Sequence, residues 1–201
     1  MEALKFKTIL FDADGVVLKS ARRFSEQIEI DYGIKTAVLQ PFFQGVFREC
    51  TVGRADLKDE LKKVIGEWGW KGTVEELMDY WFTKGTHVDE EVVEYIQSLR
   101  ERGIRCFLTT DQEKYRGQYL QDLLGHGKVF ERVFYSAEIG HTKKEPAYFA
   151  FVAQELGLST PEARKEVLFI DDDEENIEAA QSFGLQGHHY RGLEELKTFF
   201  A

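Results

Sequence analysis

One segment near the N-terminus constrains this chain more than any other: Thr8–Val17, which reads TILFDADGVV. A β-branched and aromatic run ends abruptly at Asp12, a second carboxylate follows at Asp14, and Gly15 lets the backbone turn away. We predict a buried strand that delivers two acids to its carboxyl end, where parallel α/β sheets place their ligands. The alternative is a strand that ends in a solvated Asp-Gly turn. Features of the rest of the chain distinguish these two interpretations.

Residues 19–85 follow a helical pattern that no strand pattern interrupts. Apolar residues recur there at helical spacing in successive stretches, most regularly at Leu57, Leu61, Val64 and Trp68. We therefore predict a small helical unit, residues 19–85, inserted after the first strand.

From residue 86 onward, short apolar strands alternate with amphipathic helices. The strands are expected at 104–108, 133–135, 167–170 and 187–190. Because strands that alternate with helices form right-handed crossovers, this part of the chain predicts a parallel, three-layer α/β sheet. The expected architecture is a Rossmann-like core, residues 1–18 and 86–201, interrupted by the helical unit.

Composition limits the partners and the compartment. The 201 residues are 43% hydrophobic and 13% aromatic, which is ample for a packed core, and the net charge is −10. An acidic surface argues against nucleic acids and anionic membranes as partners. There is no signal peptide and no apolar run of the roughly 20 residues that a membrane span needs, so the cytoplasm is the expected location. Cys50 and Cys106 lie far apart and give weak grounds for a disulfide, and the five His show no ligand spacing.

Polar side chains follow four of the predicted strands. Since the carboxyl ends of parallel strands meet at one edge of a sheet, these side chains are expected to converge. They are Asp12 and Asp14 after the first strand, Thr109, Thr110 and Asp111 after the second, Lys143 and Lys144 after the third, and Asp171, Asp172 and Asp173 after the fourth.

This combination suits phosphoryl transfer. Carboxylates from two strands are the hard oxygen ligands that Mg²⁺ prefers, and the substrate phosphate supplies another oxygen. A lysine cancels further negative charge, and a hydroxyl orients the phosphoryl oxygens. Asp12 can then attack phosphorus to form an aspartyl phosphate, while Asp14 protonates the leaving oxygen and later activates water.

Four segments in order along the chain resemble the motifs of the haloacid dehalogenase superfamily. FDADGVV resembles its first motif, LTTDQ its second, GHTKKEP its third and FIDDDEEN its acidic fourth. The resemblance spans essentially the whole chain and places it in the phosphatase branch, with a helical cap inserted after the first motif.

The resemblance implies roles for the two acids of the first motif. Asp12 would be the nucleophile and a Mg²⁺ ligand. Asp14 would be the general acid and base and would give its backbone carbonyl to the metal. The dehalogenases that name the superfamily lack an acid at this second position, so Asp14 favours a phosphatase or a phosphomutase.

The other motifs supply the remaining site residues that the resemblance implies. Thr110 and Lys143 would hold the phosphoryl group. Asp172 would be the main metal ligand of the fourth motif, with Asp171 assisting, and Asn176 would orient the acidic loop.

Two positions depart from the superfamily pattern. Asp111 stands where many relatives have Asn, and a negative charge close to a phosphate opposes binding. Lys144 stands where many relatives have Pro, which leaves a choice between Lys143 and Lys144 as the inward lysine. The distance to Pro146 favours Lys143.

Within the helical unit, Arg48–Asp56 is the best candidate for a loop that selects the substrate. It joins two predicted helices and reads RECTVGRAD. Arg54 can contact a second anionic group of the substrate. The alternative is a solvated surface arginine, which is the commoner situation for this residue type.

The sequence as a whole predicts a Mg²⁺-dependent phosphatase of small phosphorylated metabolites that works through an aspartyl-phosphate intermediate. One alternative is a phosphomutase of the same superfamily, which shares the first half-reaction. Another is a non-catalytic binding protein that keeps the fold. The substrate's identity and the oligomeric state are not predicted.

Overall fold

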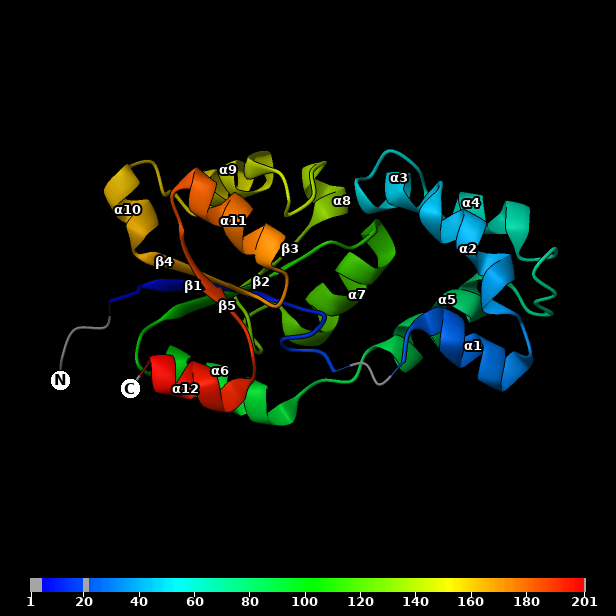
Figure 1. The fold of residues 1–201 in the computed structure, drawn as a ribbon, viewed down its shortest axis with the longest axis horizontal. Coiled ribbons are helices and arrows are strands. Elements are labelled where there is room, and N and C mark those ends of the chain that lie inside the picture. The colour runs from blue at the N-terminus through cyan, green and yellow to red at the C-terminus, as the bar shows by residue number, and fades with distance from the viewer. Residues whose placement is uncertain (1–4, 20–21, 201) are drawn as a thin grey trace.

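The computed structural model describes residues 5–19 and 22–200. Its centre is a parallel sheet in the order β3-β2-β1-β4-β5, which confirms the predicted α/β core (Figure 1). β1 pairs with both β2 and β4 and is the middle strand. The strands are β1 Thr8–Asp12, β2 Arg105–Thr110, β3 Val133–Tyr135, β4 Val167–Asp171 and β5 Gln186–His189.

The central segments of β1, β2 and β4 are apolar because helices cover both faces of the sheet. Ile9 and Phe11 of β1 face one hydrophobic cluster, and Leu10 faces another on the opposite side. In β2, Cys106 and Phe107 divide between the same two clusters. The alternation of side chains along each strand thus builds two cores from one continuous hydrophobic run.

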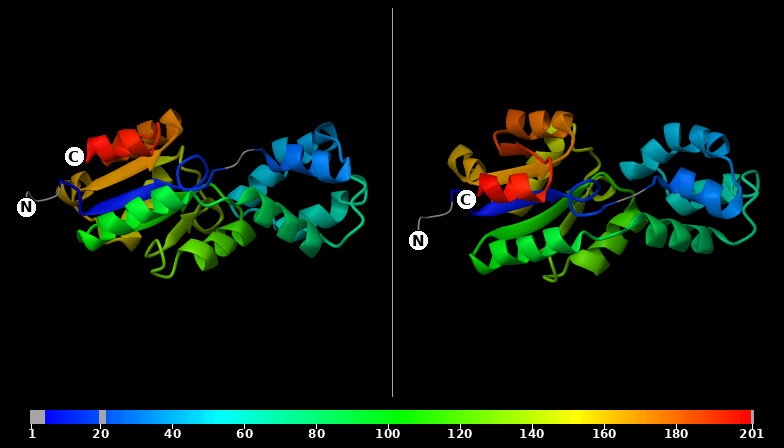
Figure 2. Two further views of the ribbon diagram at one scale, coloured as in Figure 1. Left: turned by 90° about the horizontal axis from the view of Figure 1, so that it is seen from below. Right: turned by 60° about the horizontal axis from the view of Figure 1, so that its bottom comes forward.

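Two groups of helices form the outer layers (Figures 1 and 2). The first cluster packs beneath α6 Glu90–Glu101, α7 Lys114–Leu124 and α12 Leu193–Phe199. The second packs beneath α9 Pro146–Glu155 and α11 Glu174–Phe183. Two short helices, α8 Ser136–Ile139 and α10 Pro161–Lys165, lie in connections and were not predicted, because four or five residues are too few to show a helical period.

Helices α1–α5 form a separate unit, which we call the helical insert. It lies beyond the carboxyl ends of the strands (Figures 1 and 2) and has a hydrophobic cluster of its own. Aliphatic side chains and aromatic rings share that cluster, and the rings of Phe24 and Trp81 stack with centroids 4.6 Å apart. The helices are α1 Phe24–Tyr32, α2 Thr36–Gln44, α3 Phe47–Thr51, α4 Leu57–Val64 and α5 Val74–Gly85.

The segments that enter and leave the helical insert pair with each other. Leu18 forms an antiparallel bridge with Val88. The Lys19 amide donates to the His87 carbonyl at 2.8 Å, and the Lys19 ammonium lies 2.5 Å from the buried carboxylate of Asp89. Because Val88 takes part in this bridge, α6 begins two residues later, at Glu90. The insert is therefore joined to the core by one paired, two-stranded connection.

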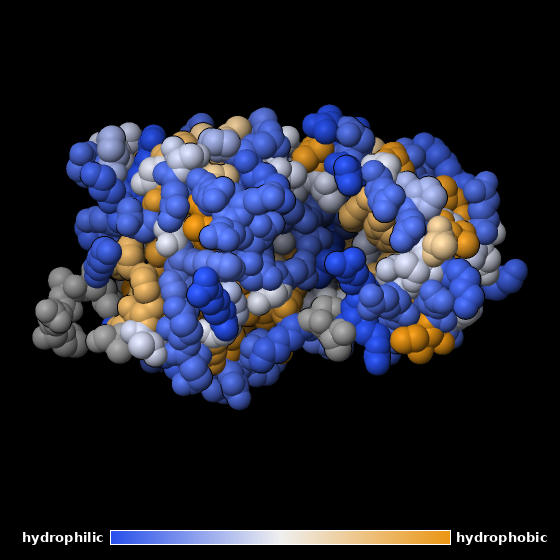
Figure 3. Space-filling model, in the orientation of Figure 1, coloured by the Kyte–Doolittle hydropathy of each residue, from blue (hydrophilic) through white to orange (hydrophobic). Residues whose placement is uncertain are grey.

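The surface in view is polar. The face drawn in Figure 3 is mostly hydrophilic, with small separate hydrophobic spots. Cys50 and Cys106 are free and buried. Within residues 5–19 and 22–200, no helix combines the length and apolarity required to cross a bilayer.

Candidate active site

Asp12 and Lys143 meet at the carboxyl edge of the sheet. Asp12 is the last residue of β1 and its side chain is only 7% exposed. The Lys143 ammonium donates to Oδ1 of Asp12 and, at 2.7 Å, to Oδ2 of Asp171, the last residue of β4. Because β1 and β4 are adjacent parallel strands, two buried carboxylates end side by side and share one buried cation.

The loop after β4 is organised around Asp171. Its Oδ1 accepts the Asp173 amide at 2.8 Å. Its two oxygens each accept from the Asn176 amide nitrogen at 3.2 Å. The Asp173 side chain in turn accepts the Glu175 amide at 3.0 Å and caps α11. Asn176 therefore orients Asp171 directly, and the capping interaction fixes where the helix starts.

Three carboxylates approach closely enough to share a cation. One oxygen each of Asp12, Asp171 and Asp172 lies within 4.8 Å of the others. Gly15 makes this possible on the β1 side, because it has a φ of 93° and a Cβ there would collide with the Asp172 carboxylate. A set of carboxylate oxygens fits the preference of Mg²⁺ for hard oxygen ligands.

The electrostatics of this cluster favour a bound cation. Burial raises the pKa of the Asp12 carboxyl, and the Asp171 carboxylate adds to the rise against the opposing effect of Lys143. Burial and Asp171 likewise raise the pKa of Asp172. Burial would lower the pKa of Lys143, but the neighbouring Asp12 and Asp171 carboxylates outweigh it and keep the lysine charged. One ammonium thus leaves negative charge that a divalent cation would neutralise.

The two threonines at the end of β2 have different environments. The Thr109 hydroxyl donates to the Phe11 carbonyl at 3.0 Å and is used inside the sheet. Thr110 is the last residue of the strand, and its amide donates to the Tyr148 hydroxyl at 3.2 Å. The hydroxyl of Thr109 is thus engaged by the backbone, and Thr110 stands nearer the strand end.

The two departures from the superfamily pattern have structural explanations. Oδ1 of Asp111 accepts the Lys143 amide at 3.0 Å, so this carboxylate anchors the backbone of the lysine loop. Burial raises the pKa of Asp111, against the opposing effect of Lys143. Lys144 points away: its side chain is 52% exposed, and its ammonium pairs with Glu175 at 2.5 Å. The lysine that reaches Asp12 is therefore Lys143.

Asp14 is held by two residues that the sequence did not single out. Its Oδ2 accepts from the Gln112 side-chain amide at 2.6 Å, and its Oδ1 accepts from Nη2 of Arg116 at 2.8 Å. The Asp14 side chain is 44% exposed. Gln112 is the last residue of the LTTDQ segment, and Arg116 lies in the first turn of α7, which begins at Lys114. Neither residue carries a sequence pattern that marks it as a partner of Asp14.

The predicted loop Arg48–Asp56 contacts the core. The Ser136 hydroxyl of α8 donates to the Thr51 carbonyl at 2.5 Å, and the Tyr115 hydroxyl of α7 donates to Asp56 at 2.8 Å. Gly53, with a φ of 71°, lies so close to the Ala137 carbonyl that a Cβ would collide with it. The backbone of the helical insert thus packs directly against the core.

Arg54 lies in this loop and pairs with Glu49. The Arg54 Nε is 2.5 Å from Oε2 of Glu49, and the arginine side chain is 61% exposed. Arg54 also lines a cavity of about 400 Å³ between the helical insert and the core, together with Glu113, Lys114 and Tyr135. Arg54 therefore lies at the boundary between the helical insert and the core, with an acidic partner already in contact.

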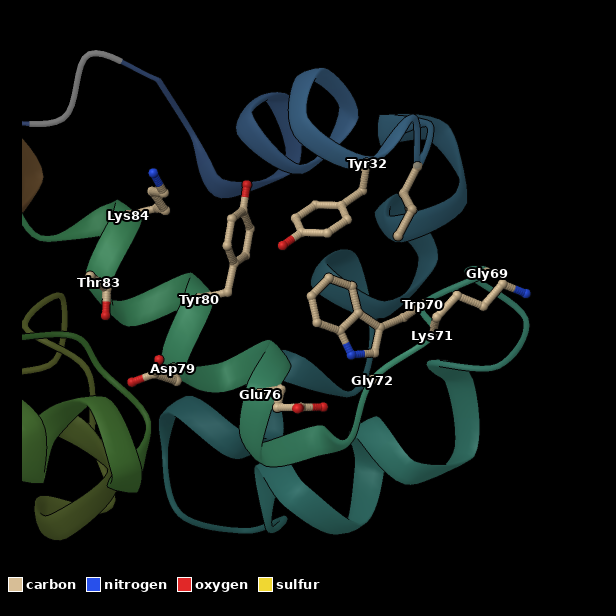
Figure 4. Close-up of a pocket in the computed structure, with 11 residues that line it drawn as sticks. Tyr32, Gly69, Trp70, Lys71, Gly72, Glu76, Asp79, Tyr80, Thr83 and Lys84 are labelled. Atoms are coloured by element: carbon tan, nitrogen blue, oxygen red, sulfur yellow. The ribbon is translucent and has the colours of Figure 1, made fainter.

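A second cavity, of about 820 Å³, lies within the helical insert (Figure 4). Tyr32, Trp70 and Tyr80 line it, and their rings contact one another, with centroids 4.8 Å apart for Tyr32 and Trp70. None of the site residues predicted from the sequence lines it. This cavity is part of the packing of the insert and is separate from the carboxylate cluster.

His189 is a further residue that the sequence did not assign. It ends β5, and its Nε2 lies 3.1 Å from the Asp172 carbonyl. This contact links the loop after β4 to the outer strand β5. Two adjacent histidines gave no sign of it, because the contact depends on β4 and β5 being neighbours.

The geometry agrees with a family match. A family model for haloacid dehalogenase-like hydrolases covers residues 6–184. The chain belongs to this family. The expected resemblance is therefore confirmed, and with it the assignment to the hydrolases.

Curated relatives and solved structures support the same family. D-ribitol-5-phosphate phosphatase of Bacteroides thetaiotaomicron is 27% identical over 190 residues, which cover 90% of this chain and 89% of that protein. Sesquiterpene phosphatase astK of Aspergillus oryzae is 25% identical over 101 residues, 50% of each chain. A haloacid dehalogenase family enzyme from B. thetaiotaomicron, solved with magnesium and inorganic phosphate, superposes with a TM-score of 0.79 at 21% identity, covering 98% of this chain and 100% of that one. The curated relatives that match are thus phosphatases, and the fold extends over the helical insert.

Proposed function

We propose that this protein is a Mg²⁺-dependent phosphatase of small phosphorylated metabolites that forms an aspartyl-phosphate intermediate. One observation carries the proposal: buried Asp12 touches Lys143 and lies within ligand-sharing distance of Asp171 and Asp172. The sequence resemblance assigns these residues to the superfamily's motif positions, and the chain belongs to the haloacid dehalogenase-like hydrolases.

In the first half-reaction, a carboxylate oxygen of Asp12 attacks phosphorus. The new bond joins Asp12 to the phosphoryl group, and the bond from phosphorus to the ester oxygen breaks. The leaving oxygen takes the proton of the Asp14 carboxyl, so the alcohol departs neutral and Asp14 becomes a carboxylate.

In the second half-reaction, Asp14 accepts a proton from water as the water oxygen attacks the same phosphorus. The bond between phosphorus and Asp12 breaks, inorganic phosphate leaves, and the Asp12 carboxylate is regenerated. Asp14 ends the cycle protonated, as it began.

The other residues of the cluster balance charge and fix geometry. Asp12 and Asp172, with Asp171 and the Asp14 carbonyl assisting, would hold Mg²⁺, which when bound neutralises charge on the phosphoryl oxygens. Lys143 and Thr110 would bind the phosphoryl group. Asn176, through its hydrogen bonds to Asp171, would keep the acidic loop in place.

Residues 19–85 are proposed to act as a cap that excludes water and selects the leaving group. The contacts of Thr51 and Asp56 with the core support this, because they seat the cap loop beside the site. One relative is named for D-ribitol 5-phosphate, so phosphates of small polyols and sugars are the first substrates to test.

The test is a panel of phosphate monoesters assayed for inorganic phosphate with Mg²⁺ present. Turnover of one or more small polyol or sugar phosphates is expected. No turnover across the panel would favour a non-catalytic binding protein. Activation by a bisphosphate, with transfer of phosphate to a sugar in place of release, would favour a phosphomutase.

A further inference from the structure

Arg116 joins three parts of the molecule at one guanidinium group. Its side chain is 12% exposed. Nη2 donates to Oδ1 of Asp14 at 2.8 Å and to the Gly85 carbonyl at 3.4 Å, and Nη1 donates to the Gln112 side chain at 3.3 Å. Through these hydrogen bonds, Arg116 links the first-motif loop to the last residue of α5 in the helical insert.

The position of Arg116 is unfavourable for the helix that carries it. Arg116 lies in the first turn of α7, where the helix dipole opposes a cation. The capping role belongs instead to the buried Glu113 carboxylate, which accepts the amides of Tyr115 and Arg116 at 2.7 and 2.6 Å. The guanidinium is therefore not explained by helix stability, and its strongest partner is Asp14.

The contact with Gly85 gives the guanidinium a third anchor. Gly85 is the last residue of α5, where the chain leaves the helical insert. That exit is itself fixed, since the His87 carbonyl accepts from Lys19 and Val88 bridges to Leu18. The planar fork of an arginine can bind a carboxylate and a carbonyl at fixed relative positions, which a lysine cannot do.

We propose that Arg116 is a positioning residue that holds the Asp14 carboxyl group in the orientation needed for proton transfer, with Gln112 and the Gly85 carbonyl as its supports. The inference rests on the proposed role of Asp14 as general acid and base. An alkyl phosphate has a poor leaving group and depends on a well-placed proton donor, whereas p-nitrophenyl phosphate has a good leaving group and needs little protonation. Loss of Arg116 therefore affects the first substrate more than the second.

The experiment compares the rate of alcohol release in the first turnover, which reports phosphorylation of Asp12, for Arg116→Met on the best alkyl phosphate of the panel and on p-nitrophenyl phosphate, because the later hydrolysis of the intermediate is common to both substrates. We expect a fall of about 10- to 100-fold on the alkyl ester and less than about 3-fold on the aryl ester. Arg116→Lys should give a ratio of the alkyl-ester rate to the aryl-ester rate that lies between those of wild type and Arg116→Met. Added guanidinium, at concentrations well below denaturing ones, should restore part of the alkyl phosphatase activity of Arg116→Ala.

Two control variants distinguish a failure of the Arg116 inference from a failure of the proposed role of Asp14. Arg100 donates to the carbonyls of Gly127, Lys128 and Val129, so Arg100→Ala removes a structural guanidinium and should neither change the substrate ratio nor respond to guanidinium. Asp14→Asn should shift the ratio at least as far as Arg116→Met. If Asp14→Asn leaves the ratio unchanged, the proposed acid and base role fails.

If Asp14→Asn shifts the ratio and Arg116→Met does not, the positioning role of Arg116 is wrong. Equal losses of Arg116→Met on both substrates would also contradict it. Should Arg116→Met fail to fold, the folded Arg116→Lys variant decides, and an unchanged ratio there overturns the inference.

Discussion

Most candidate functional residues at the edge of the core sheet are buried, whereas the candidate in the helical insert is exposed. At the carboxyl edge of the sheet, Lys143 and Asp171 are buried and each is bound to several partners. In the insert, the interior is a cluster of aliphatic and aromatic side chains, and the candidate substrate-binding residue Arg54 is exposed and paired with Glu49. A buried polar side chain has to be hydrogen-bonded and is therefore restricted to few conformations, whereas an exposed polar side chain can adopt many. The chemistry can therefore be inferred from the core, while the substrate depends on side chains with more freedom.

The two regions meet through a small set of contacts. Besides the hydrogen bonds of Ser136 and Tyr115 to the insert, the rings of Phe82 and Tyr119 lie 5.7 Å apart. If the core supplies chemistry and the insert supplies selectivity, core substitutions should affect phosphate esters whatever the size of the leaving group, and should distinguish esters only by how much the leaving group needs a proton. Insert substitutions should affect only substrates large enough to reach it.

The largest effect is expected for Asp12→Asn. Without the attacking carboxylate, activity should fall about 10⁴-fold or more on every ester, because covalent transfer has no nucleophile. Steady-state assays on an alkyl and an aryl phosphate measure this. Asp173→Asn is the matched control, since it removes a nearby charge but keeps a good helix cap, and it should remain within a few-fold of wild type. A comparable loss in Asp173→Asn would show that net charge near the site, and not the nucleophile, is at stake.

Removal of the metal should be nearly as severe. Phosphatase activity should vanish with EDTA and return with excess Mg²⁺. Saturating Mg²⁺ at about 100 times its Kd should also stabilise the fold by about 2.7 kcal/mol, visible as a higher Tm. Full activity in the chelator would refute the metal site.

The register of the acidic loop can be tested with the same metal. Asp172→Ala should weaken Mg²⁺ binding more than Asp173→Ala, because only Asp172 belongs to the carboxylate cluster. Titration of the Tm shift with Mg²⁺ compares the two. Equal weakening would mean that the fourth motif is assigned in the wrong register.

Lys143→Met should lower both activity and stability. It leaves Asp12 and Asp171 buried without their shared cation, and breaking such a pair costs about 3–5 kcal/mol. Activity should fall about 10²- to 10³-fold on all esters, as for loss of a charge-stabilising group. Lys144→Met, its exposed neighbour, is expected to stay near wild type in kcat and Tm. Similar values for the two variants would contradict the assignment of the inward lysine.

The smallest effect on activity is expected from a substitution in the helical insert. Arg54→Ala should raise KM for the best panel substrate about 3- to 10-fold and leave p-nitrophenyl phosphate turnover nearly unchanged, because only the former offers a distal group. Equal losses on both substrates would show that Arg54 acts through folding or through the core site.

The sequence predicted the core well because its signals are local. The run TILFD and the apolar segment VLFID each specify a buried strand, and the parallel topology then brings Asp12 and Asp171 together. The choice of Lys143 over Lys144 also followed from spacing. Helix ends in the insert are harder to predict: the structure ends α2 at Gln44 and begins α3 at Phe47, a break that the helical spacing of the apolar residues does not mark.

The partners of Asp14 could not be predicted from pattern alone. Arg116 reaches Asp14 across 102 positions of sequence, and its side chain had no motif to mark it. Asp111 was expected to disfavour phosphate, yet its carboxylate accepts the Lys143 amide, an interaction that depends on how two loops meet. Such contacts arise from tertiary packing, which periodicity and residue type do not encode.

The most direct test of the account traps the covalent intermediate. Asp14→Asn keeps the nucleophile but lacks the base that activates water, so an aryl or acyl phosphate should phosphorylate Asp12 and the adduct should persist. Intact-mass measurement after rapid quench should show one added phosphoryl group on Asp14→Asn and none on Asp12→Asn. The reverse pattern would exchange the two roles, and no adduct on Asp14→Asn, with wild type active, would contradict covalent catalysis by Asp12.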